Sequence, residues 1–153
     1  MPTYQTSITV NAPVERVWEV LVAVEDWPAL TASMTSVRPL DADGASRSGS
    51  ADHVVAVGRR FAVEQPKLRK AVWTVTALDE GSRFSWRSAV PGVTTSGDHL
   101  VEPEGDGTRL TLVLTQRGAL SGLVGLVAGG LTRRYLEMEA RGLKERAESP
   151  AAE

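Results

Sequence analysis

The stretch YQTSITVNAPVERVWEVLV, residues 4–22, decides the fold because its hydrophobic period changes once along its length. The first part, to Val10, alternates between the two faces of the chain, which is typical of a half-buried strand. The residues on one face of that strand are Tyr4, Thr6, Ile8 and Val10. From Val14 to Leu21 the apolar residues recur every three or four positions, which predicts a short amphipathic helix. Pro13 suits the start of this helix, since proline tolerates the first turn and presets its dihedral.

Residues 25–28, Glu-Asp-Trp-Pro, are expected to end the first helix. The proline is expected to open a second short helix that runs to about Ala32. A second strand is predicted from Met34 to Leu40. The next segment, Asp41 to Asp52, is rich in glycine, serine, aspartate and alanine, and we expect it to be a mobile loop.

A series of short strands follows, separated by turn residues rich in proline, glycine and acidic side chains. The predicted strands span residues 54–65, 71–78, 83–88, 93–101 and 109–116. Short strands joined by tight turns imply an antiparallel meander. From Gly118 the period becomes helical, which predicts a long helix that ends near Glu148. Its apolar stripe comprises Leu120, Leu123, Val124, Val127, Leu131, Tyr135, Met138 and Leu143.

This order predicts an α+β fold in which a curved antiparallel sheet of about six to seven strands wraps around the long C-terminal helix. The two short helices after the first strand are expected to close one end of the gap between sheet and helix. Such a gap is where a small ligand would bind. We expect residues 1–149 to form a single domain and residues 150–153 to be a frayed tail.

The composition argues against several classes of function. The net charge of -2, from mixed acidic and basic residues, gives no attraction for nucleic acid. The chain has no cysteine, and its two histidines, His53 and His99, are far apart in sequence, so no metal site is expected. There is no phosphate-binding glycine motif and no nucleophile elbow, so we expect no cofactor.

The N-terminal residues lack the pattern of a signal peptide. The most apolar stretch, from Leu120 to Leu131, is shorter than the about 20 residues that span a bilayer. We therefore expect a cytoplasmic protein without stable membrane insertion, either a monomer or a weak homodimer.

Several short motifs carry a resemblance to a known superfamily. They are Ile8-x-x-Asn11-Ala12-Pro13-x-x-x-Val17-Trp18-x-x-Leu21, Glu25-Asp26-Trp27-Pro28, Trp73-x-Val75, Arg83-Phe84-x-Trp86, Gly97-Asp98-His99-x-x-Glu102-Pro103 and Gly107-Thr108-Arg109-Leu110. With the order of elements, they make nearly the whole chain resemble the START-like (SRPBCC, helix-grip) superfamily, in particular its polyketide cyclase/dehydrase and lipid-transport branch.

The resemblance implies that a hydrophobic small molecule, such as a polyketide, lipid, quinone or isoprenoid, binds in an internal cavity between the sheet and the last helix. It leaves open whether the protein is an enzyme. The first alternative is a cofactor-independent polyketide cyclase or dehydratase that uses acid–base residues in that cavity. The second is a non-enzymatic domain that binds a partner protein or a membrane surface. Fold analogy alone does not decide between them.

His99 and Tyr135 are the candidate catalytic residues. If His99 points inward, its imidazole is suited to proton transfer near neutral pH. The alternative is a structural histidine bonded to a backbone group or to Asp98, and a slip of one residue in register would decide between the two. Tyr135 lies on the predicted stripe of the last helix, and a buried phenol needs a hydrogen-bond partner, which a ligand would supply.

Aromatic residues dominate the expected lining of the cavity. The candidate ligand-binding residues are Trp27, Phe61, Trp73, Phe84, Trp86, His99, Leu112 and Tyr135. The alternative for the tryptophans is that they simply fill the core.

Two further groups of residues have open interpretations. The basic cluster Arg59, Arg60, Lys67, Arg69 and Lys70 either attracts an anionic partner or is the solvated face of a hairpin. The glycines Gly118, Gly122, Gly125, Gly129 and Gly130 disfavour the start of the last helix by about 1 kcal/mol each relative to alanine. They indicate close packing, a flexible gate or a membrane contact.

Overall fold

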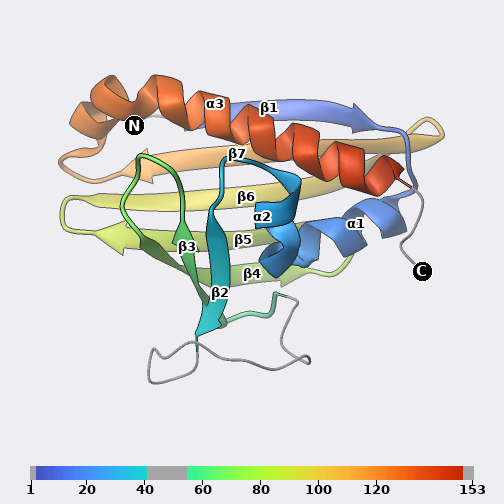
Figure 1. Ribbon diagram of the computed structural model, residues 1–153, viewed down its shortest axis with the longest axis horizontal. Helices are drawn as coiled ribbons and strands as arrows, with labels where there is room; N and C mark the ends of the chain where they lie inside the picture. The colour runs from blue at the N-terminus through green and yellow to red at the C-terminus, as the bar shows by residue number, and fades with distance from the viewer. Residues whose placement is uncertain (1–2, 41–54, 150–153) are drawn as a thin grey trace.

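A computed structural model describes residues 3–40 and 55–149 of the chain. Its elements, in chain order, are β1 (Thr3–Val10), α1 (Val14–Val22), the 3₁₀ turn η1 (Val24–Asp26), α2 (Trp27–Leu30), β2 (Ser36–Leu40), β3 (Arg60–Glu64), β4 (Ala71–Asp79), β5 (Arg83–Val90), β6 (Val93–Glu104), β7 (Gly107–Arg117) and α3 (Ser121–Glu148) (Figure 1). The predicted succession of one strand, two short helices, a series of strands and a long helix is confirmed.

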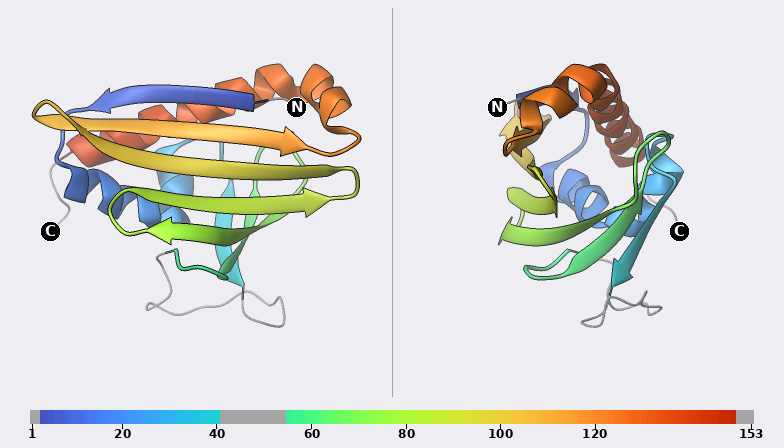
Figure 2. Two further views of the ribbon diagram at one scale, coloured as in Figure 1. Left: turned by 180° about the vertical axis from the view of Figure 1, so that it is seen from behind. Right: turned by 90° about the vertical axis from the view of Figure 1, so that its left-hand side faces the viewer.

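The described strands form one antiparallel sheet in the order β1-β7-β6-β5-β4-β3-β2. The first strand therefore lies beside the last one, because β1 pairs with β7. Seen end on, the sheet curves into a trough, and α3 lies across its open side (Figure 2). A bulge in β4 between Val75 and Ala77 shifts the register against β5, and such bulges increase local bend and twist. The predicted architecture is confirmed.

The opening motif folds as its pattern predicts. Tyr4 and Val10 are buried on the face of β1 that the alternation indicates. The carbonyl of Pro13 accepts the first N–H groups of α1, from Arg16 and Val17. The second helix ends at Leu30 instead of about Ala32, and η1 precedes it.

The strand predicted for residues 54–65 is wrong in its first half. β3 begins only at Arg60, and residues 55–59 form an irregular segment. Gly58 has a φ of 88° there, and the N–H of Arg59 bonds to the carbonyl of Ala56. A left-handed glycine makes a turn and interrupts the strand. The loop predicted at residues 41–52 lies outside the described residues.

The second half of α3 packs tightly against the sheet and the short helices. The Nζ of Lys144 donates to the carbonyl of Thr9 at 2.9 Å, and the N–H of Asn11 donates to Glu148 at 2.7 Å. Gly142 lies so close to the carbonyl of Leu30 that a Cβ atom at this position would overlap with it. These contacts fix the end of the helix against β1 and α2.

The first half of α3 differs from the predicted stripe. The side chains of Leu123 and Val127 are exposed, the latter at 79%, and Leu126 beside them is 84% exposed. Val124, which belongs to the predicted stripe, does line the cavity, together with Ala128, which the stripe did not include. A helical period in the sequence does not tell which of two neighbouring faces the sheet will cover, because leucine and valine are present on both.

Candidate ligand cavity

A cavity of about 330 Å³ lies between the concave face of the sheet and α3. Strands β4 to β7 supply its floor, and the cavity-facing side of α3 supplies its roof, from Val124 to Glu139. Most of its surface is apolar. Two of the described apolar residues that line it, Leu68 and Val90, are also exposed on the outside of the protein. They therefore mark the end at which the cavity approaches solvent.

The floor of the cavity is built from rows of residues that pair across neighbouring strands. One row is Trp86, Gly97 and Leu114, on β5, β6 and β7. A Cβ atom on Gly97 would lie 2.9 Å from the indole nitrogen of Trp86. Glycine at this position therefore lets the Trp86 ring lie across β6. Trp73 packs beside it, with 5.3 Å between the ring centroids, so that two indoles form one wall of the cavity.

His99 occupies the next row, between Phe84 and Leu112, and it lines the cavity. Its ring stacks on Phe84 with 4.0 Å between centroids and 6° between planes. Its Nδ1 lies 3.1 Å from the carbonyl oxygen of Phe84. Because a carbonyl oxygen only accepts, this bond places a proton on Nδ1 and leaves Nε2 as an acceptor.

Burial is the main influence on the His99 imidazole, and it lowers its pKa to about 4. The bond to Phe84 and the charge of Asp98 oppose this effect but are weaker. The carboxylate of Asp98 accepts a hydrogen bond from Ser85 Oγ at 2.5 Å. His99 is therefore a neutral ring at pH 7, and it combines the inward orientation and the backbone hydrogen bond that the sequence presents as alternatives.

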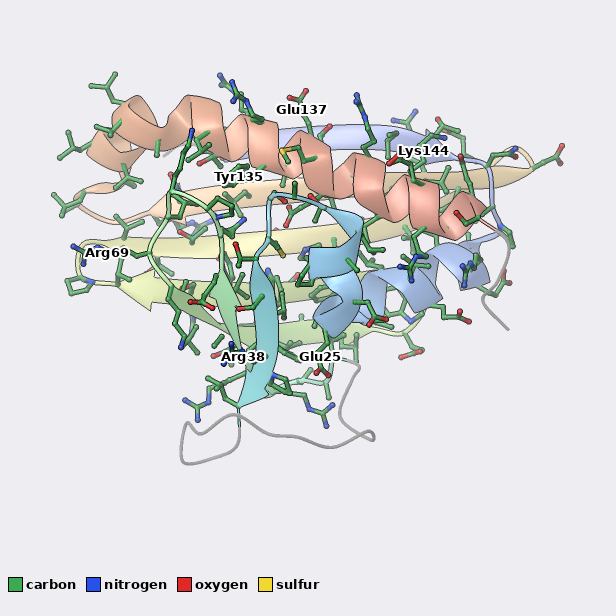
Figure 3. All side chains as sticks on the ribbon, in the orientation of Figure 1. Glu25, Arg38, Arg69, Tyr135, Glu137 and Lys144 are labelled. Atoms are coloured by element: carbon green, nitrogen blue, oxygen red, sulfur yellow. The ribbon has the colours of Figure 1, made fainter. Side chains whose placement is uncertain are left out.

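Tyr135 lines the cavity from α3, but its hydroxyl donates to the carbonyl of Pro66 at 2.5 Å. Pro66 lies in the β3–β4 hairpin, so this bond ties the hairpin to the helix. Figure 3 shows Tyr135 pointing towards the hairpin, whereas Glu137, two residues on, lies on the outer side of α3. The phenol hydroxyl thus has a partner within the chain.

The eight predicted ligand-binding residues divide into two groups. Trp73, Trp86, His99, Leu112 and Tyr135 line the cavity. Trp27, Phe61 and Phe84 lie behind them in the packed core and are at most 1% exposed. Trp27 packs edge-on against Trp86 and donates its indole N–H to the carbonyl of Leu21 at 3.2 Å. These three residues support the cavity wall without forming its surface.

Glu139 is one of the cavity residues that the sequence reasoning missed. It lines the cavity one turn beyond Tyr135 on α3, and no described residue forms a hydrogen bond or ion pair with its carboxyl group. Desolvation by burial raises the pKa of this group to about 8. The signal was its spacing: Val124, Ala128, Thr132, Tyr135 and Glu139 recur every three or four residues on one face of the helix.

A row of polar residues crosses the floor nearer the ends of the strands. Ser88 pairs with Thr95, and Thr95 pairs with Gln116, so the three side chains are neighbours on one face of β5, β6 and β7. All three line the cavity. Gln116 is only 7% exposed, and no donor in the described part of the chain reaches its amide oxygen. We refer to these three residues as the polar row.

Exposed apolar side chains gather at the end of the molecule marked by Leu68 and Val90, and we call this group the apolar rim. It also includes Leu120, Leu123, Leu126 and Val127 at the start of α3, all exposed. Arg69, from the basic cluster, lines the cavity at the β3–β4 hairpin (Figure 3). Of the glycines at this end, Gly129 packs against the ring of Tyr4, whereas Gly122 and Gly130 have open space where a side chain would lie.

Residues 3–40 and 55–149 contain no group of three acidic or histidine side chains that would hold a metal ion. None of the helices in these ranges is long and apolar enough to cross a membrane.

The family described as Polyketide cyclase / dehydrase and lipid transport matches residues 1–148. No curated protein matches the chain.

Solved structures share the fold over almost the whole chain. Protein TTHA0849 from Thermus thermophilus has a TM-score of 0.68 and 22% identity, over 95% of this chain and 97% of that one. The hypothetical protein jhp0584 from Helicobacter pylori has a TM-score of 0.78 and 13% identity, over 96% and 88%. Ara h 8.0201 has a TM-score of 0.64 and 12% identity, over 95% and 97%. At these identities the likeness shows the helix-grip fold alone.

Proposed function

We propose that this chain, which belongs to the polyketide cyclase / dehydrase and lipid transport family, binds an apolar small molecule in its cavity. A polyketide, lipid, quinone or isoprenoid is a ligand of this kind. The observation that carries the proposal is the mostly apolar cavity of about 330 Å³, which is within the size range of small-molecule sites. Family membership supports the same class of ligand.

The walls of the cavity favour a ligand with a flat, apolar body. Trp73 and Trp86 present indole surface, and Leu112 and Leu114 present aliphatic surface. The Trp86 ring is held by core residues behind it, such as Trp27, with 5.5 Å between the two ring centroids. A wall whose side chains are already fixed loses little conformational entropy when a ligand binds.

Native mass spectrometry of the purified protein, followed by extraction of bound molecules, tests this function. A titration with N-phenyl-1-naphthylamine, an uncharged fluorescent probe of apolar sites, covers the case in which the natural ligand is lost during purification. We expect an added mass or saturable probe fluorescence at one site per chain. The proposal is wrong if the folded protein carries no added mass and gives no saturable probe signal.

A second candidate function is proton-transfer catalysis on the bound molecule, as in a cofactor-independent cyclase or dehydratase. The observation that favours it is Glu139, an unpaired carboxyl group at the cavity surface that remains protonated at neutral pH. His99 has the opposite property, a neutral imidazole with Nε2 left as an acceptor. An acid and a base with pKa values shifted in opposite directions are a common arrangement in enzymes.

Substitutions in the cavity distinguish a protein that only binds its ligand from an enzyme that also transforms it. In the catalytic case, Glu139→Gln and His99→Phe each lower the rate of cyclisation of a linear β-polyketone thioester by about 10²-fold or more, with probe binding retained. Tyr135→Phe has a smaller effect, because its hydroxyl is engaged by Pro66 and its role is positioning. Unchanged turnover in the Glu139 and His99 variants would exclude this candidate.

A further inference from the structure

The polar row, Ser88, Thr95 and Gln116, is the part of the cavity whose hydrogen-bonding groups an apolar ligand body would leave without partners. The cross-strand pairing places the three side chains side by side. Within residues 3–40 and 55–149, the amide oxygen of Gln116 is the buried side-chain polar atom that has no hydrogen-bond partner. Most buried polar side chains in proteins have a partner. An enclosed acceptor without a partner, beside two hydroxyl groups that line the same cavity, indicates that the partner is a molecule that enters the cavity.

Gln116 sets the chemistry of that partner. Its amide oxygen is enclosed and has no donor among the described residues. Leaving such an acceptor unpaired costs about 1–3 kcal/mol. The last side-chain torsion of glutamine is broad, so the amide turns easily and presents its oxygen to the cavity. An acceptor in this position requires an O–H or N–H donor.

The neighbours of Gln116 restrict the partner further. Ser88 and Thr95 each carry a hydroxyl that donates and accepts, and neither carries a charge. The row therefore offers hydrogen bonds in both directions and carries no charge itself, and the basic side chain that lines the cavity, Arg69, lies on the β3–β4 hairpin and not on the strands of the row. An uncharged alcohol or phenol matches this set, because its single hydroxyl donates one bond and accepts another.

We propose that the polar row binds an uncharged hydroxyl group of the ligand, with Gln116 as the acceptor, and that the apolar body of the ligand lies along Trp86 and Leu114. This proposal rests on the proposed function and adds the chemical class of the ligand. The row of Trp86, Gly97 and Leu114 is two residues farther along each strand, about 7 Å from the polar row. A hydroxyl on one end of a flat ligand therefore fixes how deep its body enters.

Isothermal titration calorimetry with three naphthalenes tests the proposal. 2-Naphthol carries a hydroxyl, 2-methoxynaphthalene retains the oxygen but has no donor, and 2-methylnaphthalene has neither. We expect wild-type protein near neutral pH to bind 2-naphthol about tenfold more tightly than 2-methoxynaphthalene. In Gln116→Met, which keeps the length of the side chain and removes the amide, this ratio falls to near one, while 2-methylnaphthalene binds at least as tightly as before.

Gln5→Met is the matched control, because Gln5 is exposed on β1, on the face opposite to the buried Tyr4, and pairs with Val113, three residues from Gln116 along β7. It should leave all three affinities unchanged. If wild-type protein shows no preference for 2-naphthol, or if Gln116→Met keeps the preference, the polar row is not the hydroxyl site, although the apolar cavity stands. If none of the three compounds binds to the folded wild-type protein, the proposed function is wrong, and this assignment is wrong with it.

Discussion

Burial shifts the pKa values of two cavity residues, His99 and Glu139, in opposite directions. Burial disfavours a charge on either side chain, so it lowers the pKa of the imidazole to about 4 and raises that of the carboxyl group to about 8. Both groups are therefore uncharged at neutral pH. The cavity holds an acceptor and a donor without holding a net charge from either residue.

The low pKa of His99 predicts that folding weakens in mild acid. The unfolded chain takes up a proton near pH 6.5, whereas the folded protein resists until about pH 4, so the contribution of the neutral ring is complete above pH 6.5 and is lost as the pH falls. The loss amounts to about 3 kcal/mol by pH 4. Urea unfolding of wild-type protein and of His99→Phe, repeated at several pH values between 4 and 6.5, gives the free energy of unfolding as a function of pH. The loss is the difference between the pH slopes of the two proteins. Equal slopes would contradict the shift.

The raised pKa of Glu139 predicts the opposite dependence of folding stability on pH. Its pKa is raised, so the folded protein holds this proton more tightly than the unfolded chain does, and stability falls as the pH rises from about 4.5 to about 8. Glu139→Gln cannot ionise and should be more stable than wild type at pH 8, with a smaller difference at pH 5. Glu137→Gln, on the outer side of α3, serves as the control and should follow wild type (Figure 3). A Glu139→Gln variant that gains no stability at pH 8 would contradict a buried, unpaired carboxyl group.

The sequence allowed part of this site to be predicted. Trp73, Trp86 and Leu112 were expected to face inward because strict alternation along a strand assigns each residue to a face, whereas the orientation of His99 stayed open because it depends on the register. Glu139 was missed because a glutamate on a helix is usually solvated, and only its spacing from Tyr135 marks it. Gln116 was missed because the absence of a partner is a property of the folded protein and leaves no pattern in the sequence.

At the scale of elements, α3 has two halves with different roles. The second half is fixed by Lys144, Glu148 and the close approach of Gly142 to α2. The first half carries the exposed leucines and valine of the apolar rim and roofs the cavity with small residues. The extent and position of this helix were predictable from its period. Which face it buries was not, because that depends on how the curved sheet meets it.

Two glycines of α3 should respond to alanine in opposite directions. Gly142→Ala places a methyl group against the carbonyl of Leu30, and we expect a loss of about 1–3 kcal/mol in the free energy of unfolding. Gly130→Ala meets open space on an exposed helical surface, and we expect a gain of up to about 1 kcal/mol. Thermal and urea unfolding of the two variants measure both changes. A Gly142→Ala protein as stable as wild type would show that α2 and α3 are not in close contact.

At the scale of the whole molecule, the sheet, α3 and the β3–β4 hairpin together enclose the cavity. The hydrogen bond from Tyr135 to Pro66 connects the hairpin to the helix beside the opening. The general architecture was predictable because a sheet with one apolar face needs a cover and the sequence offers one long helix. The irregular segment at residues 55–59 was not, since it depends on the left-handed conformation of Gly58.

The most direct test of ligand binding in the cavity is a titration of two tryptophan variants of α3 with N-phenyl-1-naphthylamine. Ala128→Trp places an indole in the roof of the cavity, whereas Leu126→Trp places the same ring on the outer surface, where the present side chain is 84% exposed. We expect Leu126→Trp to bind the probe as wild type does and Ala128→Trp, folded as judged by circular dichroism, to lose at least tenfold in affinity. Equal binding by both variants would contradict the account, because the probe would then occupy a site outside the cavity.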